Sequence, residues 1–215
     1  MSSNAISLHS CADAAQDAGP LRATPVRAAA WTTPEPGLTV WFTGLSAAGK
    51  TTLASALGKK LRKADVPTVV LDADVLRQGF CAGLGFSRED RTENVRRIAE
   101  LAHRLSKAGA VVLVAAIAPY RDTRAAARAR AGNFLEVYVN APLETCIARD
   151  PKGLYARAIA GEIPHFTGIN DPYEEPLAPD IECRTDIESV ADCTAVLLAA
   201  VMQTRTQYFA DGVAG

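Results

Sequence analysis

The sequence predicts an α/β fold in which helices cover both faces of a central parallel sheet. Short, uninterrupted apolar runs rich in β-branched residues recur along the chain and alternate with segments that carry helical periodicity or helix-start signals. Such runs are typical of strands buried on both faces, as in parallel sheets. With 215 residues, 48% of them hydrophobic and 22% charged, the chain suits one globular domain that needs no disulfide or metal to fold.

The first expected strand, residues 38–43, is followed by a glycine-containing loop and by a helix expected over residues 52–61. The loop reads Gly44-Leu45-Ser46-Ala47-Ala48-Gly49-Lys50-Thr51 and matches the phosphate-loop pattern G-x-x-x-x-G-K-[ST]. A strand, such a loop and a helix in this order aim backbone N–H groups at a phosphate. In this motif the Lys50 ammonium reaches the β- and γ-phosphates, and the Thr51 hydroxyl is a ligand of Mg²⁺. The predicted fold is therefore a three-layer P-loop-containing nucleoside triphosphate hydrolase-like fold.

Acidic residues directly follow the second expected strand, residues 67–71. Asp72, Asp74 and Arg77 would lie at the carboxyl edge of the sheet, where ligands bind in parallel α/β folds. Asp74 could also serve as the N-cap of a following helix. We favour the functional interpretation because of their position.

A long helix is expected to begin at Ser87, because Ser87 and Asp90 form a pattern like a capping box. It would continue to residue 107 and bury a stripe made of Ile98, Leu101, Ala102 and Leu105. Arg91 and Asn94 share one face near its start, where they could jointly hold a polar ligand. A charged first turn is more often only solvated, so these residues alone leave the matter open.

Further strands are expected over residues 110–117 and 134–140, with a short edge strand over 181–184. The remaining helices are expected over residues 121–131, 143–149 and 186–203. The first of them, which alternates Arg and Ala, is expected to be exposed, and Pro142 would occupy the first turn of the second. Residues 150–179, rich in Gly, Pro, aromatic and charged residues, are predicted to form a lid.

Charge and composition exclude several classes of function. A net charge of −1 and a pI of 6.3 provide no field for nucleic acid or an acidic membrane, and no apolar run is long enough to span a bilayer. Five scattered cysteines without a C-x-x-C pattern favour a reducing, cytoplasmic location. Residues 1–36 are expected to form a disordered extension before a single domain over 37–215, and Asp13 and Asp17 argue against a signal peptide.

Several further segments carry specific patterns: Asp72-x-Asp74-x-x-Arg77, Gly85-Phe86-Ser87-x-x-Asp90-Arg91-x-Glu93-Asn94, Ala118-Pro119-Tyr120-Arg121, Lys152-Gly153-Leu154-Tyr155 and Phe166-Thr167-Gly168-Ile169-Asn170. Together with the phosphate loop, and in unbroken order from about Trp41 to the end of the expected lid, they resemble the adenylylsulfate kinase family. The resemblance implies a P-loop kinase of sulfate assimilation. Such a kinase transfers the γ-phosphate of ATP to the 3′-hydroxyl of adenosine 5′-phosphosulfate (APS), giving 3′-phosphoadenylyl sulfate and ADP.

The resemblance also implies roles for these residues, with ATP and APS as substrates and Mg²⁺ as the cofactor. Lys50 and Asp74 would be catalytic, with Asp74 orienting or deprotonating the acceptor hydroxyl, while Thr51 and Asp72 would serve the metal. ATP would be bound by Gly44, Ser46, Ala47, Ala48, Gly49, Lys50, Thr51 and Thr52. APS would be bound by Asp74, Arg77, Phe86, Arg91, Asn94, Ile117, Ala118, Lys152, Phe166 and Thr167, with the two phenylalanines on either face of its adenine.

Two residues depart from the family's pattern. Ala47 stands where glycine is frequent, which is harmless if the φ angle of Ala47 is negative. Ala118 stands where the family commonly has a serine that has been linked to a phosphoenzyme intermediate. Without that hydroxyl, direct in-line transfer from ATP to the acceptor is expected.

Other functions stay open at this point. An inactive or regulatory nucleotide-binding relative would keep the same loop. Another small-molecule P-loop kinase would also keep it, but would leave the block of residues 85–94 unexplained. A guanine-specific switch would need an N-K-x-D-type base reader after a late strand, and residues 139–142 offer none. A homodimer is expected, and a functional link to an ATP sulfurylase is left open.

Overall fold

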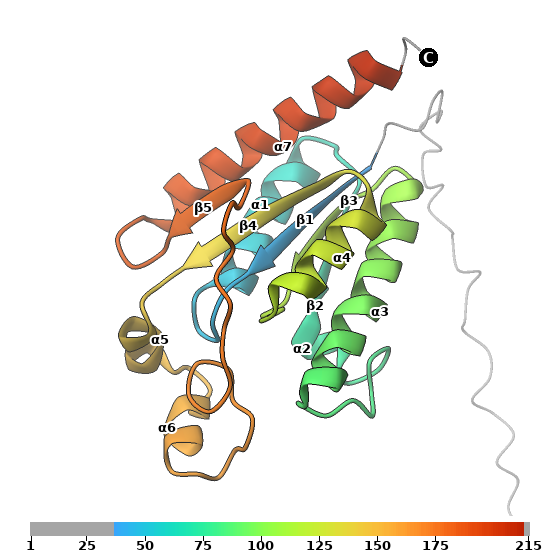
Figure 1. The fold of residues 1–215 in the computed structure, drawn as a ribbon. Coiled ribbons are helices and arrows are strands. Elements are labelled where there is room, and N and C mark those ends of the chain that lie inside the picture. Colours follow the sequence, from blue (N-terminus) through green and yellow to red (C-terminus); the bar gives the residue numbers. More distant parts are fainter. Residues whose placement is uncertain (1–36, 213–215) are drawn as a thin grey trace, which may run out of the picture. The chain divides into compact units, whose positions relative to one another are not determined.

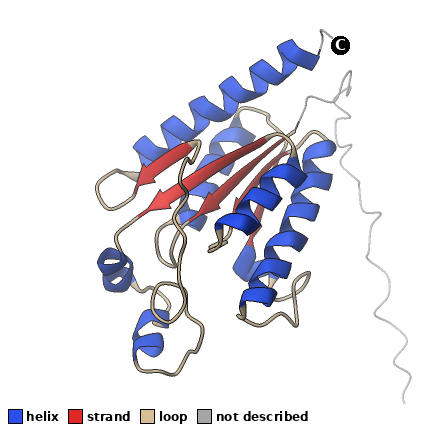
Figure 2. Ribbon diagram, viewed as in Figure 1, coloured by secondary structure: helices blue, strands red, loops and turns tan. Residues whose placement is uncertain are grey.

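The computed structural model describes residues 37–212, which are built around one parallel sheet (Figure 1, Figure 2). Its strands are β1 (Leu38–Thr43), β2 (Thr68–Asp72), β3 (Val111–Ala115), β4 (Phe134–Asn140) and β5 (Ile181–Arg184). They are arranged in the order β2-β3-β1-β4-β5, and every neighbouring pair is parallel. All five were expected, and β5 lies at an edge as predicted. The expected extension, residues 1–36, lies outside the described residues.

Helices cover both faces of the sheet, which confirms the predicted three-layer fold. One face is covered by α1 (Lys50–Lys63) and α7 (Val190–Gly212), and the other by α3 (Arg88–Lys107) and α4 (Arg121–Ala131). Within residues 37–212, no helix combines the length and the apolar character that a membrane span requires.

Strand β1 shows how the sequence builds a hydrophobic core on each side of the sheet. Leu38, Val40 and Phe42 pack into the core beneath α1 and α7, whereas Trp41 packs into the core beneath α3 and α4. Alternate residues of a strand point to opposite faces, so an uninterrupted apolar run fills both cores. Burial of β1 on both faces fixes the strand whose end carries the phosphate loop.

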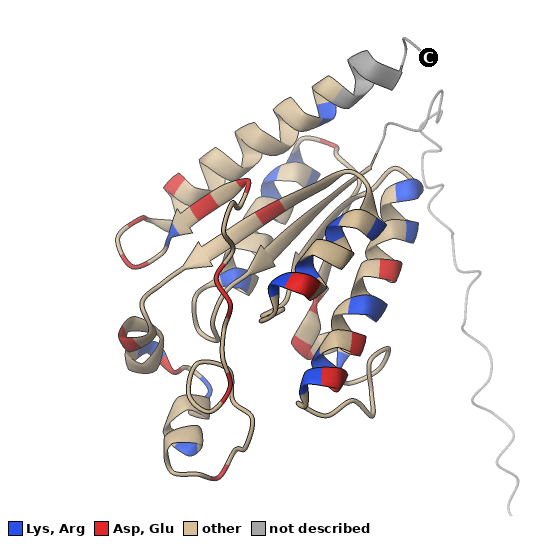
Figure 3. Cartoon of the chain, viewed as in Figure 1, with Lys and Arg blue, Asp and Glu red and all other residues tan. Residues whose placement is uncertain are grey.

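Helix α4 corrects the expectation of an exposed helix. Its residues Thr123, Arg124, Ala127 and Ala131 are buried, and Arg124 is only 3% exposed. Charged positions are concentrated on α3 and α4 (Figure 3), but the buried face of α4 uses small alanines and one hydrogen-bonded arginine. The buried face could not be predicted from the Arg/Ala alternation, because an arginine is buried only where residues distant in the sequence accept its hydrogen bonds.

Two helix starts also differ from the expectation. Asp72 rather than Asp74 caps α2 (Ala73–Leu76), since the Asp72 carboxylate accepts a hydrogen bond from the backbone N–H of Asp74 at 2.9 Å. Pro142 is the N-cap of α5 (Leu143–Arg149) and does not lie in its first turn. Ser87 caps α3 by accepting from the N–H of Asp90 at 3.1 Å, as predicted.

The predicted lid, residues 150–179, contains a helix that the sequence did not indicate, α6 (Leu154–Ile159). The αL conformation of Gly153 precedes it, with a φ of 64°. The Asp150 carboxylate accepts hydrogen bonds from the N–H groups of Tyr155 and Ala156 at 3.1 and 3.0 Å. These contacts order the first turn of α6 and join it to the end of α5.

Candidate active site

A cavity of about 700 Å³ lies where the phosphate loop, the carboxyl ends of β2 and β3, the start of α3 and the lid meet. Its volume is typical of small-molecule sites. Of the predicted site residues, those that line it are Ser46, Ala47, Gly49, Lys50, Thr51, Thr52, Asp72, Asp74, Arg77, Phe86, Arg91, Ile117, Lys152, Phe166 and Thr167. The predicted site residues that do not line it are Gly44, Ala48, Asn94 and Ala118. Residues predicted to bind the phosphate donor and residues predicted to bind the acceptor therefore line one cavity.

The phosphate loop depends on glycine at its first position. Gly44 has a φ of 150°, and a Cβ built there would lie 2.4 Å from the carbonyl oxygen of Val139. At the end of the loop, Gly49 has a φ of 104° and directly precedes α1. The Thr185 hydroxyl donates to the Ala48 carbonyl at 2.7 Å and holds the loop from the side of β5. The loop thus delivers the N-terminus of α1, with its unpaired N–H groups, to the cavity.

Lys50 lies folded against its own loop. Its Nζ donates to the backbone carbonyls of Gly44 at 3.0 Å and Leu45 at 2.6 Å. Burial lowers the pKa of Lys50 to about 8, although the negative charge of nearby Asp74 partly offsets this effect. Near neutral pH the charged form of Lys50 is therefore favoured only slightly over the neutral form, and an anionic ligand would stabilise the charged form.

The affinity of the site for an ATP analogue should fall as the pH rises above about 8. Protonated Lys50 attracts the phosphates, and a bound polyphosphate raises the pKa of Lys50 in turn, so that binding at higher pH must take up a proton. We expect calorimetric titration with a non-hydrolysable ATP analogue to show at most about a tenfold loss of affinity per pH unit above that pKa. A Lys50→Met variant should lack this dependence. An affinity of the unaltered protein that is flat from about pH 7 to about pH 10 would contradict the assignment.

Ala47 does not meet the condition of a negative φ under which an alanine would be harmless. Its φ is 59°, in the left-handed region that side chains other than glycine rarely adopt. For an L-residue this conformation costs about 1–2 kcal/mol. The loop therefore stores backbone strain at residue 47.

An Ala47→Gly variant should be as stable as the unaltered protein or more stable by up to about 1 kcal/mol, because relief of the φ strain exceeds the added entropy of the unfolded chain. Urea unfolding measures the difference. Ala56→Gly, in the interior of α1, is the matched control and should lose about 1 kcal/mol. An equal loss in both variants would rule out strain at residue 47.

Thr51 and Asp72 lie together at the start of α1 and the end of β2. The Thr51 hydroxyl donates to the Asp72 carboxylate at 2.7 Å, and both residues line the cavity. No group of three or more His, Cys, Asp or Glu residues in the described part of the chain could hold a metal. One hydroxyl and one carboxylate nevertheless suit Mg²⁺, which keeps several waters and takes other ligands from substrate phosphates.

Asp74 is joined to the lid. Lys152 donates to its carboxylate at 2.6 Å, and the side chains of Lys152 and Asp74 are 62% and 69% exposed. This hydrogen bond raises the pKa of Lys152. A pair this exposed contributes about 0–1 kcal/mol to stability, so both charges remain available for a ligand.

The far end of the cavity combines two arginines with an aromatic ring. Arg77 donates to the carbonyls of Leu84 at 3.1 Å and Gly85 at 3.0 Å, and its guanidinium lies 4.6 Å from the centre of the Phe86 ring. Arg91 is buried and donates to the carbonyls of Phe86 and His165. Each arginine thus has part of its donor fork fixed by backbone oxygens, a preorganised arrangement for an anion.

Two buried polar atoms near this end are unpaired. The Oδ1 of Asn94 and the Oγ1 of Thr167 have no hydrogen-bond partner among the described residues, and both residues are nearly inaccessible to solvent. Buried polar groups without partners are rare in folded proteins and often mark places where a ligand or water completes the site. Thr167 lines the cavity, whereas Asn94 does not.

The sequence predicted no role for Tyr155, which contacts both the phosphate loop and the lid. It is fully buried, its hydroxyl donates to the Ser46 carbonyl at 3.1 Å, and its ring meets Phe166 edge-on with centres 5.0 Å apart. The Lys152–Tyr155 pattern was the only signal for it in the sequence. His165 and Ile163 also line the cavity and were not predicted.

Comparison with known proteins gives a consistent result. A family model described as adenylylsulphate kinase matches residues 36–184. The adenylyl-sulfate kinase of Chloroflexus aurantiacus is 58% identical over 165 residues, which are 77% of this chain and 89% of that protein. The one from Gloeothece citriformis is 55% identical over 162 residues, which are 75% of this chain and 92% of that protein.

Solved structures that are similar to this chain include APS kinases as well. The Mycobacterium tuberculosis APS kinase, in complex with AMPPNP and APS, matches with a TM-score of 0.76 and 45% identity, over 79% of this chain and 99% of that chain. A hexameric APS kinase from Thiobacillus denitrificans matches with a TM-score of 0.60 and 32% identity, over 79% of this chain and 29% of that chain.

Proposed function

The chain belongs to the adenylylsulfate kinase family and is an ATP-dependent adenylylsulfate kinase, and from this premise we propose which residues carry out the transfer. The reaction moves the γ-phosphate of ATP to the 3′-hydroxyl of APS and yields 3′-phosphoadenylyl sulfate and ADP, a step of sulfate assimilation. The residue assignment rests on one observation: the phosphate loop and the cluster of Arg77, Arg91 and Phe86 line the same cavity, the loop at one end and the cluster at the other.

The donor end would hold the phosphates of ATP through the backbone N–H groups of the loop and the start of α1. Lys50 would leave the carbonyls of Gly44 and Leu45, to which it now donates, and place its ammonium on the terminal phosphates. Thr51 and Asp72 would hold Mg²⁺, which when bound neutralises the charge that develops on the phosphates. The 2.7 Å contact between their oxygens supports this choice of ligands.

The acceptor end would hold APS. Arg77 and Arg91 suit its phosphosulfate, and Phe86 and Phe166 suit its adenine by stacking. Asp74 would orient the 3′-hydroxyl or accept its proton, and Lys152 would share its hydrogen bond between Asp74 and the substrate as the lid closes. The similar structure, with a TM-score of 0.76, contains both AMPPNP and APS, which supports the proposal that this fold binds two nucleotides.

Transfer would be direct, without a phosphorylated protein. Ala118 is 3% exposed and its methyl group offers no oxygen to accept a phosphoryl group. We expect turnover with γ-labelled ATP, followed by denaturation and electrophoresis, to place label in the nucleotide product and none on the protein. Label retained on the unaltered chain, but absent from a Lys50→Ala control, would contradict direct transfer.

The function itself is tested by ADP release. A coupled assay should report ADP release that depends on APS and is absent with nucleosides or sugar acids. Turnover of another acceptor in place of APS would favour a different small-molecule kinase, and tight binding of APS without ADP release would identify an inactive relative. Either result would overturn the proposed transfer to APS.

Three further parts of the proposal concern the assembly of the protein, its location and the source of APS. Self-association of this chain is supported by the hexameric relative from Thiobacillus denitrificans. A cytoplasmic location is supported by the described cysteines, Cys81, Cys146, Cys183 and Cys193, which are all buried and free. A functional link to an ATP sulfurylase follows from the chemistry, because APS must come from a reaction that adenylates sulfate.

A further inference from the structure

The segment that leaves the lid is fastened to the segment that follows β3. We call residues 173–175 the lid stem and residues 117–121 the β3 exit. The N–H of Glu174 donates to the Pro119 carbonyl at 2.8 Å, and the N–H of Arg121 donates to the Glu174 carboxylate at 2.8 Å. At the end of β1, the Thr43 hydroxyl donates to the Ile117 carbonyl at 2.6 Å and lies 2.9 Å from the Tyr173 hydroxyl.

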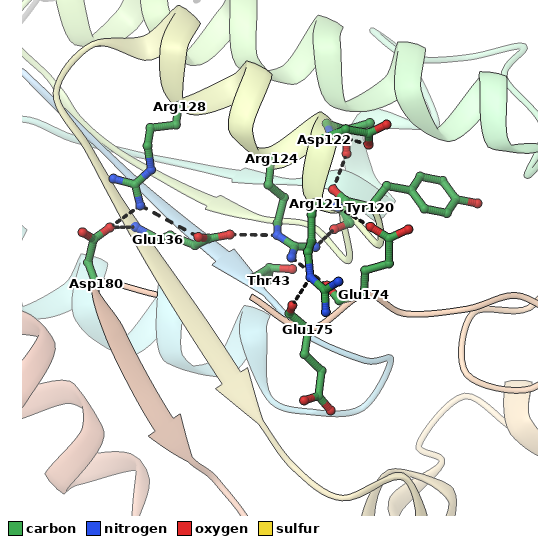
Figure 4. A network of polar contacts seen from close by, with 12 residues as sticks. Thr43, Tyr120, Arg121, Asp122, Arg124, Arg128, Glu136, Glu174, Glu175 and Asp180 are labelled. Carbon is green, nitrogen blue, oxygen red and sulfur yellow. Dashed lines mark hydrogen bonds and ion pairs between the residues drawn. The ribbon is translucent and has the colours of Figure 1, made fainter. Parts of the chain in front are cut away.

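One buried guanidinium joins these two segments to the sheet (Figure 4). Arg124 reaches from α4 and donates to three acceptors: Nε to the Glu136 carboxylate at 2.8 Å, Nη1 to the Ala118 carbonyl at 2.7 Å and Nη2 to the Glu174 carbonyl at 2.6 Å. Its side chain is 3% exposed, and that of Glu136 on β4 is 13% exposed. The β3 exit, the lid stem and the sheet therefore meet at a single side chain.

Arginine suits this position for a physical reason. Its planar fork carries donors in fixed directions, whereas a lysine ammonium is a compact charge that cannot reach three spread acceptors at once. Ala118 has a φ of 43°, a strained conformation for a residue with a side chain, and such conformations persist only where surrounding contacts hold them. The bond from Arg124 to its carbonyl is such a contact.

We propose that Arg124 is a positioning residue for the acceptor, holding the β3 exit and the lid stem in the register that forms the APS end of the cavity. This inference rests on the proposed function, because Ile117 in the β3 exit lines the cavity where APS would bind. Arg124 itself lines no part of the cavity and acts through Ala118 and Glu174. The hydrogen bonds of Arg124 run to Glu136, Ala118 and Glu174 and not to the phosphate loop, so we expect ATP binding to be independent of Arg124.

The test compares Arg124→Lys with the unaltered protein by titration of APS and ADP and by steady-state kinetics. We expect Kd and KM for APS to rise about tenfold or more, since displacement of a bound group by about 1 Å is costly, while Kd for ADP stays within about twofold. A purely structural role would lower the active fraction, and with it kcat, and would leave both affinities unchanged. Melting temperatures show that each variant is folded at the assay temperature.

Arg128→Ala is the matched control. Arg128 lies one turn further along α4, contacts the Asp180 carboxylate at 2.5 Å and the same Glu136 carboxylate at 3.8 Å, and has no bond to the β3 exit or the lid stem. The Arg128→Ala variant should leave the affinity for APS unchanged. The inference fails if Arg124→Lys binds APS as the unaltered protein does, if ADP binding weakens equally, or if Arg128→Ala shows the same split. Failure of the unaltered protein to bind APS would instead overturn the proposed function as well.

Discussion

A Lys50→Ala variant should release ADP in the presence of APS about a hundredfold to a thousandfold more slowly than the unaltered protein. Removing one preorganised donor from developing transition-state charge costs about 10²–10³-fold, and Lys50 is the one ammonium that the loop itself supplies. ADP should still bind, because the backbone N–H groups of the loop remain. The coupled assay measures turnover, and titration measures ADP affinity.

Lys59→Ala provides the control for this prediction. Lys59 lies on the same helix, α1, is exposed and does not line the cavity, so its removal should leave turnover unchanged. The fold of Lys50→Ala should be retained, since burial disfavours the charge of Lys50 in the folded protein. Turnover of Lys50→Ala within about tenfold of the unaltered protein would show that the ammonium does not act on the transferred phosphate.

An Asp74→Asn variant should lose about 10²–10⁴-fold in turnover, the usual contribution of a general base, with little change in stability. The amide can still accept a hydrogen bond but cannot take the proton of the 3′-hydroxyl. The Asp74 side chain is 69% exposed, and the ion pair it would lose with Lys152 is a surface pair. Steady-state kinetics should therefore show the loss in kcat, with unchanged thermal unfolding.

Two controls separate this role from simple ion pairing. Lys152→Ala removes the same pair from the other side, and should raise KM for APS without the large loss in kcat. Asp122→Asn removes an exposed carboxylate that is paired with Arg88 at a distance of 3.1 Å. Neither residue lines the cavity, so this variant should change neither kcat nor the KM for APS. Equal losses of kcat in Asp74→Asn and Lys152→Ala would mean that Asp74 serves only to hold the lid.

Local sequence patterns were sufficient to predict the strands, the phosphate loop and the fold class of this protein. The five strands follow from short apolar runs, and the phosphate loop follows from residue types at fixed spacing between a strand and a helix. The fold class and the family followed from these features and from the specific blocks around Arg91 and Phe166. Such features are readable because each depends on residues that are close together in the chain.

Contacts between distant residues decided the rest. The order β2-β3-β1-β4-β5, the burial of Arg124 and the contact between Asp74 and Lys152, 78 positions apart, all require the packed chain. The left-handed conformation of Ala47 is likewise set by the loop around it, since alanine by itself disfavours a positive φ. Periodicity shows which face of an element is apolar, but only packing determines which side chains meet and which charges are paired, because those energies arise between segments that are far apart in the sequence.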